Sequence, residues 1–340
     1  MQRPKASVCV PTYNGSAFLA QTLTSISKQT FEDYEVIIVD DQSWDDTLAI
    51  AEQYAANDAR VHVFRNNDRA GSSARNANRC LTHASGEWIK FLFQDDLMAP
   101  DCLARMVEAG RSGRFVLCWH DYLFAPDVDA EVRAGYENLP SLKAAFPKTY
   151  AGVEDFCNAV LRHWNINFMG PTSASFIHRD CFTAHGPFSS EIVTFPDLEC
   201  WIRLGSREGL AIVPERLVTF RVHNTSISAR LRDGKARQFQ HELEPVLLLL
   251  YLARSPNYES MRMHARRQVP PVDPDLLLAR AALSARWKAT DARYRQRNRS
   301  ALDHWTAFCR QHPELLDVLR EADAAGGIWP RLKHYLKTRL

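Results

Sequence analysis

The chain has 340 residues, well above the ~150 residues of a typical domain, so one large domain or two are expected. Hydrophobic residues make up 46% of it and charged residues 24%, which argues against a disordered, collagen-like or coiled-coil protein. Its longest apolar run, Val246 to Ala253, is far shorter than the ~20 residues that cross a bilayer, so we expect no membrane-spanning helix.

The net charge of +2 hides an uneven distribution along the chain. Residues 230–340 carry 21 Lys and Arg against 12 Asp and Glu, a net charge of +9. Residues 1–229 carry 21 against 28, a net charge of −7. An acidic front part and a basic back part suggest different roles, and an acidic surface is not expected to bind nucleic acid.

The amino terminus and the cysteines indicate a reducing compartment. Met1 to Lys5 lead directly into an apolar run, so we expect no signal peptide and a cytoplasmic location. The eight cysteines are scattered without a Cys-x-x-Cys pair, mostly among apolar residues. We therefore interpret them as reduced core residues, not as disulfides or a zinc site.

The front part alternates short apolar runs with helical patterns. Helical spacing is found over residues 18–26, 43–54 and 74–84. Between these helices, strands are predicted at Val8–Val10, Glu35–Val39, Val61–Phe64 and Trp88–Phe93. This order predicts an α/β fold with a mostly parallel sheet and helices on both faces.

The rest of the chain is less regular and then almost entirely helical. We predict strands at 115–119 and 218–222, an apolar stretch at 173–177, and helices after Pro100 and at 153–164 and 197–204. Beyond residue 230 we expect a helical extension, interrupted by Pro256 and by the Val269–Pro274 linker. One helix is predicted over Leu276–Arg299.

Several common phosphate-binding and hydrolytic motifs are absent from the sequence. It contains no P-loop, no Gly-x-Gly-x-x-Gly after the first strand and no Gly-x-Ser-x-Gly elbow. What remains are carboxylate pairs directly after predicted strands, Asp40-Asp41 and Asp95-Asp96. Such pairs can bind a hard divalent cation that bridges to phosphate, or they can simply cap the next helix.

Read together, five segments of the front part resemble the family 2 glycosyltransferases, which are inverting nucleotide-sugar enzymes of GT-A fold. The resemblance covers roughly residues 5–230. The segments occur in the order Val10–Asn14, Ser25–Phe31, Glu35–Thr47, Gly71–Asn78 and Gly86–Asp101. It implies a GT-A type Rossmann-like catalytic domain over 1–230. The basic helical region predicted over 231–340 lies outside the resemblance.

The resemblance also implies roles for single residues. Thr12 and its neighbours would line the base pocket, Asp41 would accept a hydrogen bond from the base, and Arg75 would contact base or diphosphate. The full set implied to bind the nucleotide is Pro11, Thr12, Tyr13, Asn14, Asp41, Arg75, Gln94 and Asp95.

A Mn²⁺ or Mg²⁺ ion is implied as cofactor, bound by Asp95, with Asp96 and His223 as further ligands. The sequence departs from the family's Asp-x-Asp motif, because Phe93 stands where the first Asp is expected. His223 lies in Arg221–Ser228, which resembles the segment that ends the catalytic region; a structural role for this histidine is the alternative.

Phe195–Leu204 resembles the segment that carries the family's general base, which here would be Asp197. An inverting transfer needs such a base to take the proton of the attacking hydroxyl. Pro196 replaces an expected Glu, and Glu199 is an alternative base. We interpret Trp201 and Arg203 as a packing residue and a partner in an ion pair.

The basic region mixes Arg and Lys with Trp and Tyr over 276–299 and again in the tail at 328–337. Such a surface can dock on anionic lipid, where a lipid-linked acceptor resides, and so place the protein on the inner face of the membrane. The alternative is that its apolar residues pack on the catalytic domain or on a second copy in a homodimer.

The sequence therefore predicts an inverting glycosyltransferase of cell-surface polysaccharide synthesis. It would move a sugar from a nucleoside diphosphate donor, UDP being our first expectation, to a saccharide or lipid-linked hydroxyl. Two alternatives are a sugar nucleotidyltransferase and a non-catalytic nucleotide-sugar-binding subunit. Against the first, Pro11–Gly15 is not the Gly-rich basic loop of that class.

Overall fold

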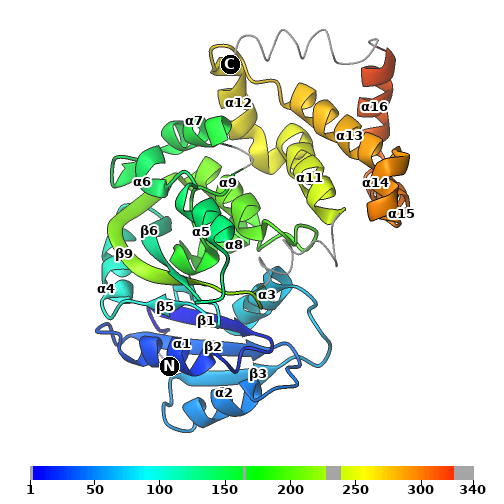
Figure 1. The fold of residues 1–340 in the computed structure, drawn as a ribbon. Coiled ribbons are helices and arrows are strands. Elements are labelled where there is room, and N and C mark those ends of the chain that lie inside the picture. The colour runs from blue at the N-terminus through cyan, green and yellow to red at the C-terminus, as the bar shows by residue number, and fades with distance from the viewer. Residues whose placement is uncertain (1–2, 164–165, 227–238, 325–340) are drawn as a thin grey trace. The chain divides into compact units, whose positions relative to one another are not determined.

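The computed structural model describes residues 3–163, 166–226 and 239–324 (Figure 1). The chain forms two compact units: Met1–Ala159 with Ile166–Ser226, and Val160–Asn165 with Ile227–Leu340. The domain boundary expected at residue 230 and the basic tail at 328–337 lie outside the described residues.

The first unit is built around one sheet, whose strand order over the described residues is β3-β2-β1-β4-β8-β6-β9-β5, with β7 paired to β9. Its parallel half consists of β3, β2, β1 and β4. The other half is mixed: β8 runs antiparallel to β4 and β6, while β6 and β9 are parallel. The bounds of the strands are β1 Ala6–Thr12, β2 Tyr34–Asp40, β3 Val61–Arg65, β4 Trp88–Phe91, β5 Leu97–Met98, β6 Phe115–Phe124, β7 Tyr150–Ala151, β8 Ser175–His178 and β9 Leu210–Val222.

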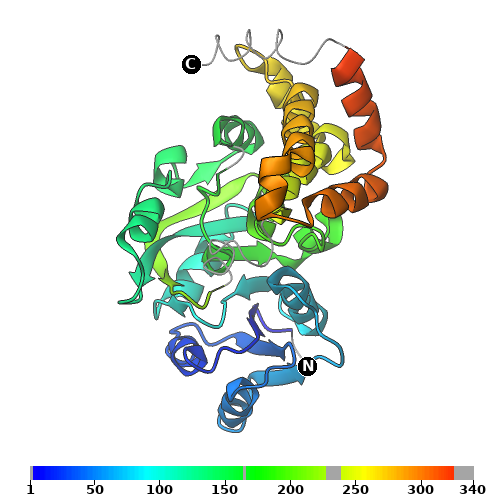
Figure 2. The ribbon, with the colours of Figure 1, turned by 45° about the vertical axis from the view of Figure 1, so that its right-hand side comes forward.

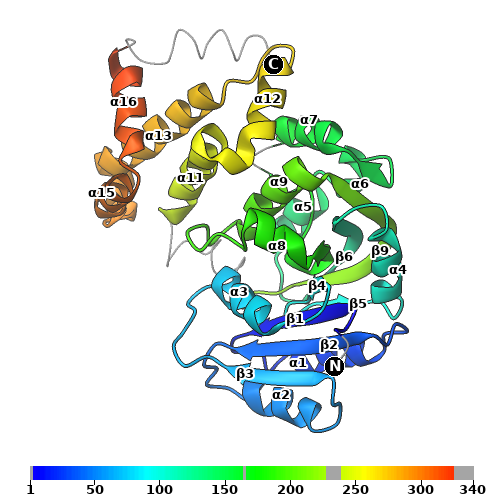
Figure 3. The same ribbon diagram turned by 180° about the vertical axis from the view of Figure 1, so that it is seen from behind.

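Helices cover both faces of the parallel half, as the alternation of elements predicts (Figures 2 and 3). All seven residues of β1 are buried, which is typical of a strand covered on both sides. Val8 and Val10 share a core cluster with residues of α1, α2 and α4, whereas Cys9 contacts Cys80 of α3 on the other face. The bounds of the first unit's helices are α1 Leu19–Ser27, α2 Thr47–Ala55, α3 Ser73–His83, α4 Cys102–Ala109, α5 Ala130–Glu137, α6 Leu142–Ala145, α8 Arg179–His185 and α9 Pro196–Glu208, and α7 Val153–His163 ends in the second unit.

The cysteines agree with the interpretation as reduced core residues. All eight are free, seven of them are buried, and Cys309 is half-buried.

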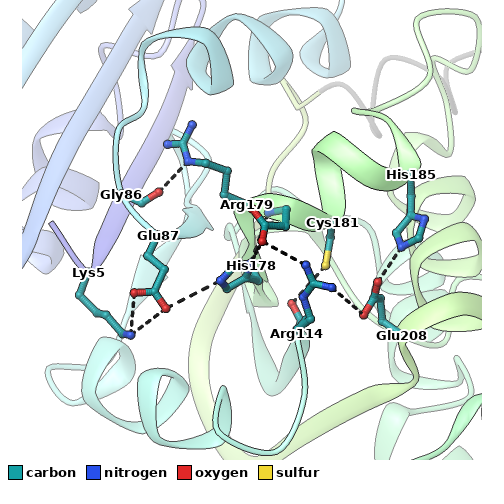
Figure 4. A network of polar contacts seen from close by, with 10 residues as sticks. Lys5, Gly86, Glu87, Arg114, His178, Arg179, Cys181, His185 and Glu208 are labelled. Carbon is teal, nitrogen blue, oxygen red and sulfur yellow. Dashed lines mark hydrogen bonds and ion pairs between the residues drawn. The ribbon is translucent and has the colours of Figure 1, made fainter. Parts of the chain in front are cut away.

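A chain of alternating charges ties α8 and α9 to the strands (Figure 4). Glu87, which precedes β4, accepts from Lys5 at 2.9 Å and lies 3.7 Å from His178 at the end of β8. Arg114, which precedes β6, contacts Asp180 of α8 at 3.3 Å.

The same chain continues to the end of α9. Glu208 there lies 3.7 Å from Arg114 and 2.6 Å from His185, the last residue of α8 (Figure 4). The carboxyl-terminal end of α9 is thereby anchored at the start of the central strands. This anchoring fixes the direction of the helix that carries Asp197 at its other end.

The second unit is helical over its described residues, as expected. Its helices are α11 Gln240–Arg254, α12 Glu259–Arg267, α13 Pro274–Thr290, α14 Ala292–Arg297, α15 Ala301–Gln311 and α16 Glu314–Ala324. The prediction of one helix over 276–299 is wrong, because α13 and α14 are separated at Asp291. The backbone of Asp291 is extended, and its carboxylate accepts from the N–H groups of Arg293 and Tyr294, which starts a new helix.

The longest described helix, α13, has 17 residues. No helix in the described ranges combines the length and the apolar character that crossing a bilayer requires.

Candidate functional site

The predicted site residues gather where the parallel strands end. Thr12 and Asp40, the last residues of β1 and β2, are register partners, and Cys9 pairs with Phe91 at the end of β4. The loops after these three strands therefore leave the same edge of the sheet, which is where ligands bind in open α/β sheets.

Gln94 holds the loop after β1. Its Oε1 accepts from the Tyr13 N–H at 2.8 Å, and its Nε2 donates to the Tyr13 carbonyl at 3.0 Å. A Cβ at Gly15 would lie 2.3 Å from Cδ of Gln94, so a larger residue at position 15 would displace this amide from Tyr13. The side chain of Gln94 thus positions Tyr13, and its role as a direct nucleotide contact stays a prediction.

The following N–H groups of this loop bind the loop between β2 and α2. Those of Asn14, Gly15 and Ser16 donate to Ser43 Oγ, Thr47 Oγ1 and Asp45 Oδ2 at 2.9, 2.7 and 3.2 Å. Because protein oxygens already accept from these groups, the loop is not a cradle of free N–H groups such as a P-loop offers.

The carboxylate pair after β2 has two structural tasks. Asp40 is fully buried and accepts from the Ser43 N–H at 2.9 Å, in the loop before α2. The helix begins at Thr47 without a side-chain cap, so the capping alternative is wrong for Asp40. Asp41 is 4% exposed and binds the 66–71 loop: it accepts from the Asn66 side chain at 2.8 Å and from the Gly71 N–H at 3.2 Å. A nucleotide base that contacts Asp41 would have to share carboxylate oxygens that already accept these hydrogen bonds, and this contact stays a prediction.

The loop that Asp41 holds brings Arg69 to the site, a residue that the sequence analysis missed. Its guanidinium lies 4.2 Å from the ring centroid of Tyr13. A cation–π contact at this distance gives the Tyr13 ring a defined orientation beside the predicted base pocket. An exposed Arg in a loop carries no sequence signal of its own.

Two neighbours on α3 behave differently. Asn76 is buried and donates to the carbonyls of Thr12 and Val39 at 3.2 and 3.0 Å, so it joins the ends of β1 and β2. Asn76 lies in the family-like segment Gly71–Asn78, and its role at the strand ends is not predicted by the sequence. Arg75 is exposed and donates to the Ser190 carbonyl at 3.2 Å; its contact with base or diphosphate stays a prediction.

The structure brings together two of the three residues implied to bind metal. His223 Nε2 lies 3.0 Å from Asp95 Oδ2, although 128 positions separate them in the chain. The other ring nitrogen of His223 lies 2.8 Å from Thr225 Oγ1, and the Phe18 ring packs 4.6 Å away. A histidine oriented through its second nitrogen in this manner is typical of metal ligands.

Asp96 is directed into the protein instead. It is 1% exposed, its Oδ2 accepts from the Ser173 hydroxyl, and its Oδ1 accepts from the Arg221 N–H at 3.0 Å. Burial, reinforced by the neighbouring Asp95, holds the pKa of this carboxyl well above its usual range. Asp96 therefore links β4 to the segments around β8 and β9, and its metal binding stays a prediction.

The donor set suits a cation that also binds phosphate. Within the described ranges no three His, Cys, Asp or Glu side chains cluster closely enough to hold a metal ion by themselves. Mg²⁺ is commonly held by one or two carboxylates together with substrate phosphates and water. One carboxylate and one imidazole at the sheet edge fit that mode of binding.

Asp197 lies at the start of α9, directly after Pro196 in the first helical position. Its Oδ2 accepts from Asn167 Nδ2 at 2.9 Å, and its Oδ1 from the Leu198 N–H at 2.8 Å. Burial raises the pKa of Asp197 to about 6. A carboxylate with this pKa is basic enough to take a proton near neutral pH. The sequence analysis did not identify Asn167, which lies 30 positions before Asp197 in the chain.

Glu199 is occupied by the ion pair that we expected for Arg203. Arg203 Nε and Nη2 donate to its two oxygens at 2.8 and 3.0 Å, and both side chains are buried. Arg203 also donates to the carbonyl groups of residues 185–187. This pairing disfavours Glu199 as the alternative base, and the fully buried Trp201 is the packing residue expected.

The raised pKa of Asp197 predicts a stability effect. The pKa of Asp197 is about 6 in the folded state and near 3.9 in the unfolded state. Between pH 3.9 and pH 6 the folded state therefore binds more protons than the unfolded state, so the free energy of unfolding falls as pH rises through this window. Because an amide does not titrate, Asp197→Asn should gain on the order of 2 kcal/mol in free energy of unfolding relative to the parent between pH 4.5 and pH 7.5. The two pH values are compared because the amide keeps only one acceptor oxygen, a cost that is the same at both. Urea unfolding at pH 4.5 and 7.5 measures it; a gain that is equal at both pH values would contradict the assignment.

Comparisons with known proteins identify relatives of the chain in sequence and in fold. A model of the glycosyl transferase family 2 domain matches residues 7–169. An uncharacterized protein of Mycobacterium tuberculosis is 30% identical over 244 residues, 69% of this chain and 74% of the relative. A GalNAc(5)-diNAcBac-PP-undecaprenol beta-1,3-glucosyltransferase of Campylobacter jejuni is 36% identical over 110 residues, which cover 32% of this chain and only 36% of that enzyme.

Solved structures show the same fold at low sequence identity. TarS 1–349 of S. aureus, in complex with UDP-GlcNAc, superposes with a TM-score of 0.60 at 14% identity, covering 91% of this chain and 92% of TarS. A mannosyltransferase of Pyrobaculum calidifontis, in complex with GDP-Man and Mn²⁺, gives 0.52 at 18% identity, covering 91% and 85%. The expected GT-A type fold is thereby confirmed, and the chain is an enzyme that belongs to the family 2 glycosyltransferases.

Proposed function

We propose that this glycosyltransferase inverts the configuration of the transferred sugar, taking it from a nucleoside diphosphate donor and passing it to a hydroxyl of a saccharide or lipid-linked acceptor. The observation that carries the proposal is Asp197, a carboxylate with a pKa of about 6, in the same unit as the Asp95–His223 pair. The complexes of TarS with UDP-GlcNAc and of the mannosyltransferase with GDP-Man support a nucleotide-sugar donor, and UDP remains our first choice.

The donor would bind at the edge formed by the loops after β1, β2 and β4. Tyr13, oriented by Gln94 and Arg69, offers an aromatic face to the base. Asp95 and His223 would hold a Mn²⁺ or Mg²⁺ ion against the diphosphate. When bound, the cation would neutralise the negative charge of the departing nucleoside diphosphate.

Asp197 would act as the general base. It accepts the proton of the acceptor hydroxyl while that oxygen forms a bond to the anomeric carbon. The bond from the anomeric carbon to the diphosphate breaks on the opposite face, and the electron pair leaves with the nucleoside diphosphate. The configuration at the anomeric carbon is inverted, and the proton stays on the carboxylate until solvent removes it.

Asp197→Asn is predicted to lower kcat by about 10²–10⁴-fold, because an amide cannot take the proton. Donor affinity should stay close to that of the parent, since the two side chains are nearly isosteric. In the parent, kcat/KM should rise with pH and level off above about 6, where Asp197 is ionised. The measurement is sugar transfer from UDP-sugars between pH 5 and 8.

The matched control is Asp155→Asn, an exposed carboxylate in the first turn of α7. Glu199→Gln is unsuitable, because it leaves the buried Arg203 with a neutral partner and should destabilise the fold. If Asp197→Asn retains most of its turnover, the proposed base is wrong. If the parent binds nucleotide sugars but transfers nothing to any acceptor, a non-catalytic subunit is the better interpretation.

Asp95→Ala and His223→Ala should remove the strengthening of UDP binding by metal. Substituting an outer partner of a metal ligand already costs about 10–100-fold in metal affinity, so losing a ligand should cost at least as much. Titration calorimetry of UDP with Mg²⁺, with Mn²⁺ and with chelator measures this. Asp101→Ala, an exposed carboxylate six positions from Asp95, is the control. Equal affinity of the parent with metal and with chelator would refute the metal site.

We also propose that the basic second unit docks on anionic lipid from the cytoplasmic side, which would place the enzyme beside a lipid-linked acceptor of cell-surface polysaccharide synthesis. Trp287 on α13 is 61% exposed, and Arg280, Arg293 and Arg295 on α13 and α14 are exposed as well. Basic residues near an anionic surface contribute ~1 kcal/mol each, and an exposed Trp suits the interface.

Replacing Arg280, Arg293 and Arg295 by Glu should weaken co-sedimentation with anionic liposomes at low salt by about 100-fold or more. The matched control replaces Lys28, Arg111 and Lys148, which are exposed in the first unit, by Glu. The lipid proposal fails if the parent does not co-sediment with the liposomes. It also fails if both triple variants lose the same share of liposome binding. Sedimentation velocity of the parent then tests the alternative of a homodimer.

A further inference from the structure

The second half of β6 departs from regular strand geometry close to the candidate base. Residues 116–118 pair regularly with β9, but the register shifts on both sides of Trp119. Such bulges are common next to active sites, where they redirect side chains. Beyond the bulge the strand carries His120, Tyr122 and Phe124, which alternate with Asp121 and Leu123.

A series of contacts leads from Asp197 to this segment. Asn167 donates to Asp197 at 2.9 Å and to the Gly170 carbonyl at 3.1 Å. Gly170 has φ +102°, and a Cβ there would lie 2.8 Å from Cε1 of His120. The imidazole of His120 therefore packs directly on the turn that positions the base.

The polar groups of this segment suit a neutral, hydroxyl-rich ligand. Burial lowers the pKa of His120 to about 4, so its imidazole is uncharged near neutral pH and can both donate and accept a hydrogen bond. Nε1 of Trp119 is buried and has no hydrogen-bond partner among the described residues. A buried donor of this kind is costly unless another molecule supplies an acceptor.

Aromatic rings continue the surface away from the base. The ring centroid of Tyr122 lies 5.0 Å from His120, 5.2 Å from Tyr136 of α5 and 6.2 Å from Phe220 of β9. All four side chains are half-buried. Helix α5 contains no buried residue, so it is not packed into the core in the way that α1 or α3 is.

We propose that Trp119, His120, Tyr122 and Phe220 form the subsite that binds a pyranose ring of the acceptor, with Tyr136 on α5 as its outer wall. The inference rests on the proposed function, because a saccharide acceptor must present its hydroxyl to Asp197. Aromatic faces stack on the apolar C–H faces of a sugar ring, while the indole N–H and the imidazole bind its hydroxyl groups. The subsite begins at the turn that holds Asp197, which places a bound ring within the reach of the base.

Saturation-transfer NMR of the full chain with UDP and Mg²⁺ tests the proposal. The probes are methyl glycosides of glucose, galactose, mannose and N-acetylglucosamine, in both anomeric forms. At least one of them should show transfer from the parent. Its affinity should fall about two- to tenfold in Tyr122→Leu and in Phe220→Leu, which keep an apolar side chain but remove the aromatic face. Trp119→Phe, which keeps a ring and removes the N–H, should weaken it as well.

Tyr150→Leu is the matched control, since Tyr150 is 44% exposed on β7 of the same unit. UDP affinity, measured in parallel, confirms that each variant is folded. No transfer to any glycoside from a parent that binds UDP overturns the subsite and leaves the donor part of the proposed function intact. Unchanged glycoside affinity in both Leu variants also overturns it, because the rings then serve only to pack α5. A parent that binds neither UDP nor GDP overturns the proposed function itself, whereas binding of GDP alone overturns only the choice of UDP.

Discussion

The requirement that buried polar groups find hydrogen-bond partners determines the architecture of the site. Strands β1, β2 and β4 end at the same edge of the sheet, and polar residues follow each of them. Most of these side chains bind neighbouring backbone: Gln94 binds Tyr13, Asp41 binds Gly71, and Asn76 binds Thr12. An unpaired buried group would cost about 1–3 kcal/mol, so this edge is constrained before any ligand arrives.

Asp95 and Asp197 stand apart from this pattern. The side chain of Asp95 is 21% exposed and faces His223, while Asp197 is held by one amide and by its own helix. Burial without a cationic partner raises the pKa of Asp197, which costs stability above pH 6 and leaves a carboxylate that can take a proton. Asp96, the residue after Asp95, is buried, but two donors hold it, and it serves the fold. Neighbouring carboxylates thus have different tasks because their partners differ.

The sequence predicted most of the first unit, because its strands are buried runs separated by helices of clear period. The Asp95–His223 pair also follows from it, since both residues lie just after strands in family-like segments. It could not show that Arg69 stacks on Tyr13 or that Asn167 holds Asp197, because these contacts depend on loop geometry across many positions. The break between α13 and α14 was missed for a local reason: Asp291 competes for backbone N–H groups within an otherwise helical pattern.

Helix α3 explains how the sheet edge after β1 and β2, where we propose that the donor binds, and helix α9 keep their relative positions without a strand joining them. On one side Asn76 binds the ends of β1 and β2. Two residues further on, and so on the opposite side of the helix, Asn78 exchanges two hydrogen bonds with the backbone of Phe188, at 2.8 and 3.0 Å. Arg203 of α9 holds the preceding carbonyls of residues 185–187. Since α9 also carries Asp197, the proposed base is positioned from the proposed donor site through side-chain contacts to backbone, each of which tolerates little change in residue type.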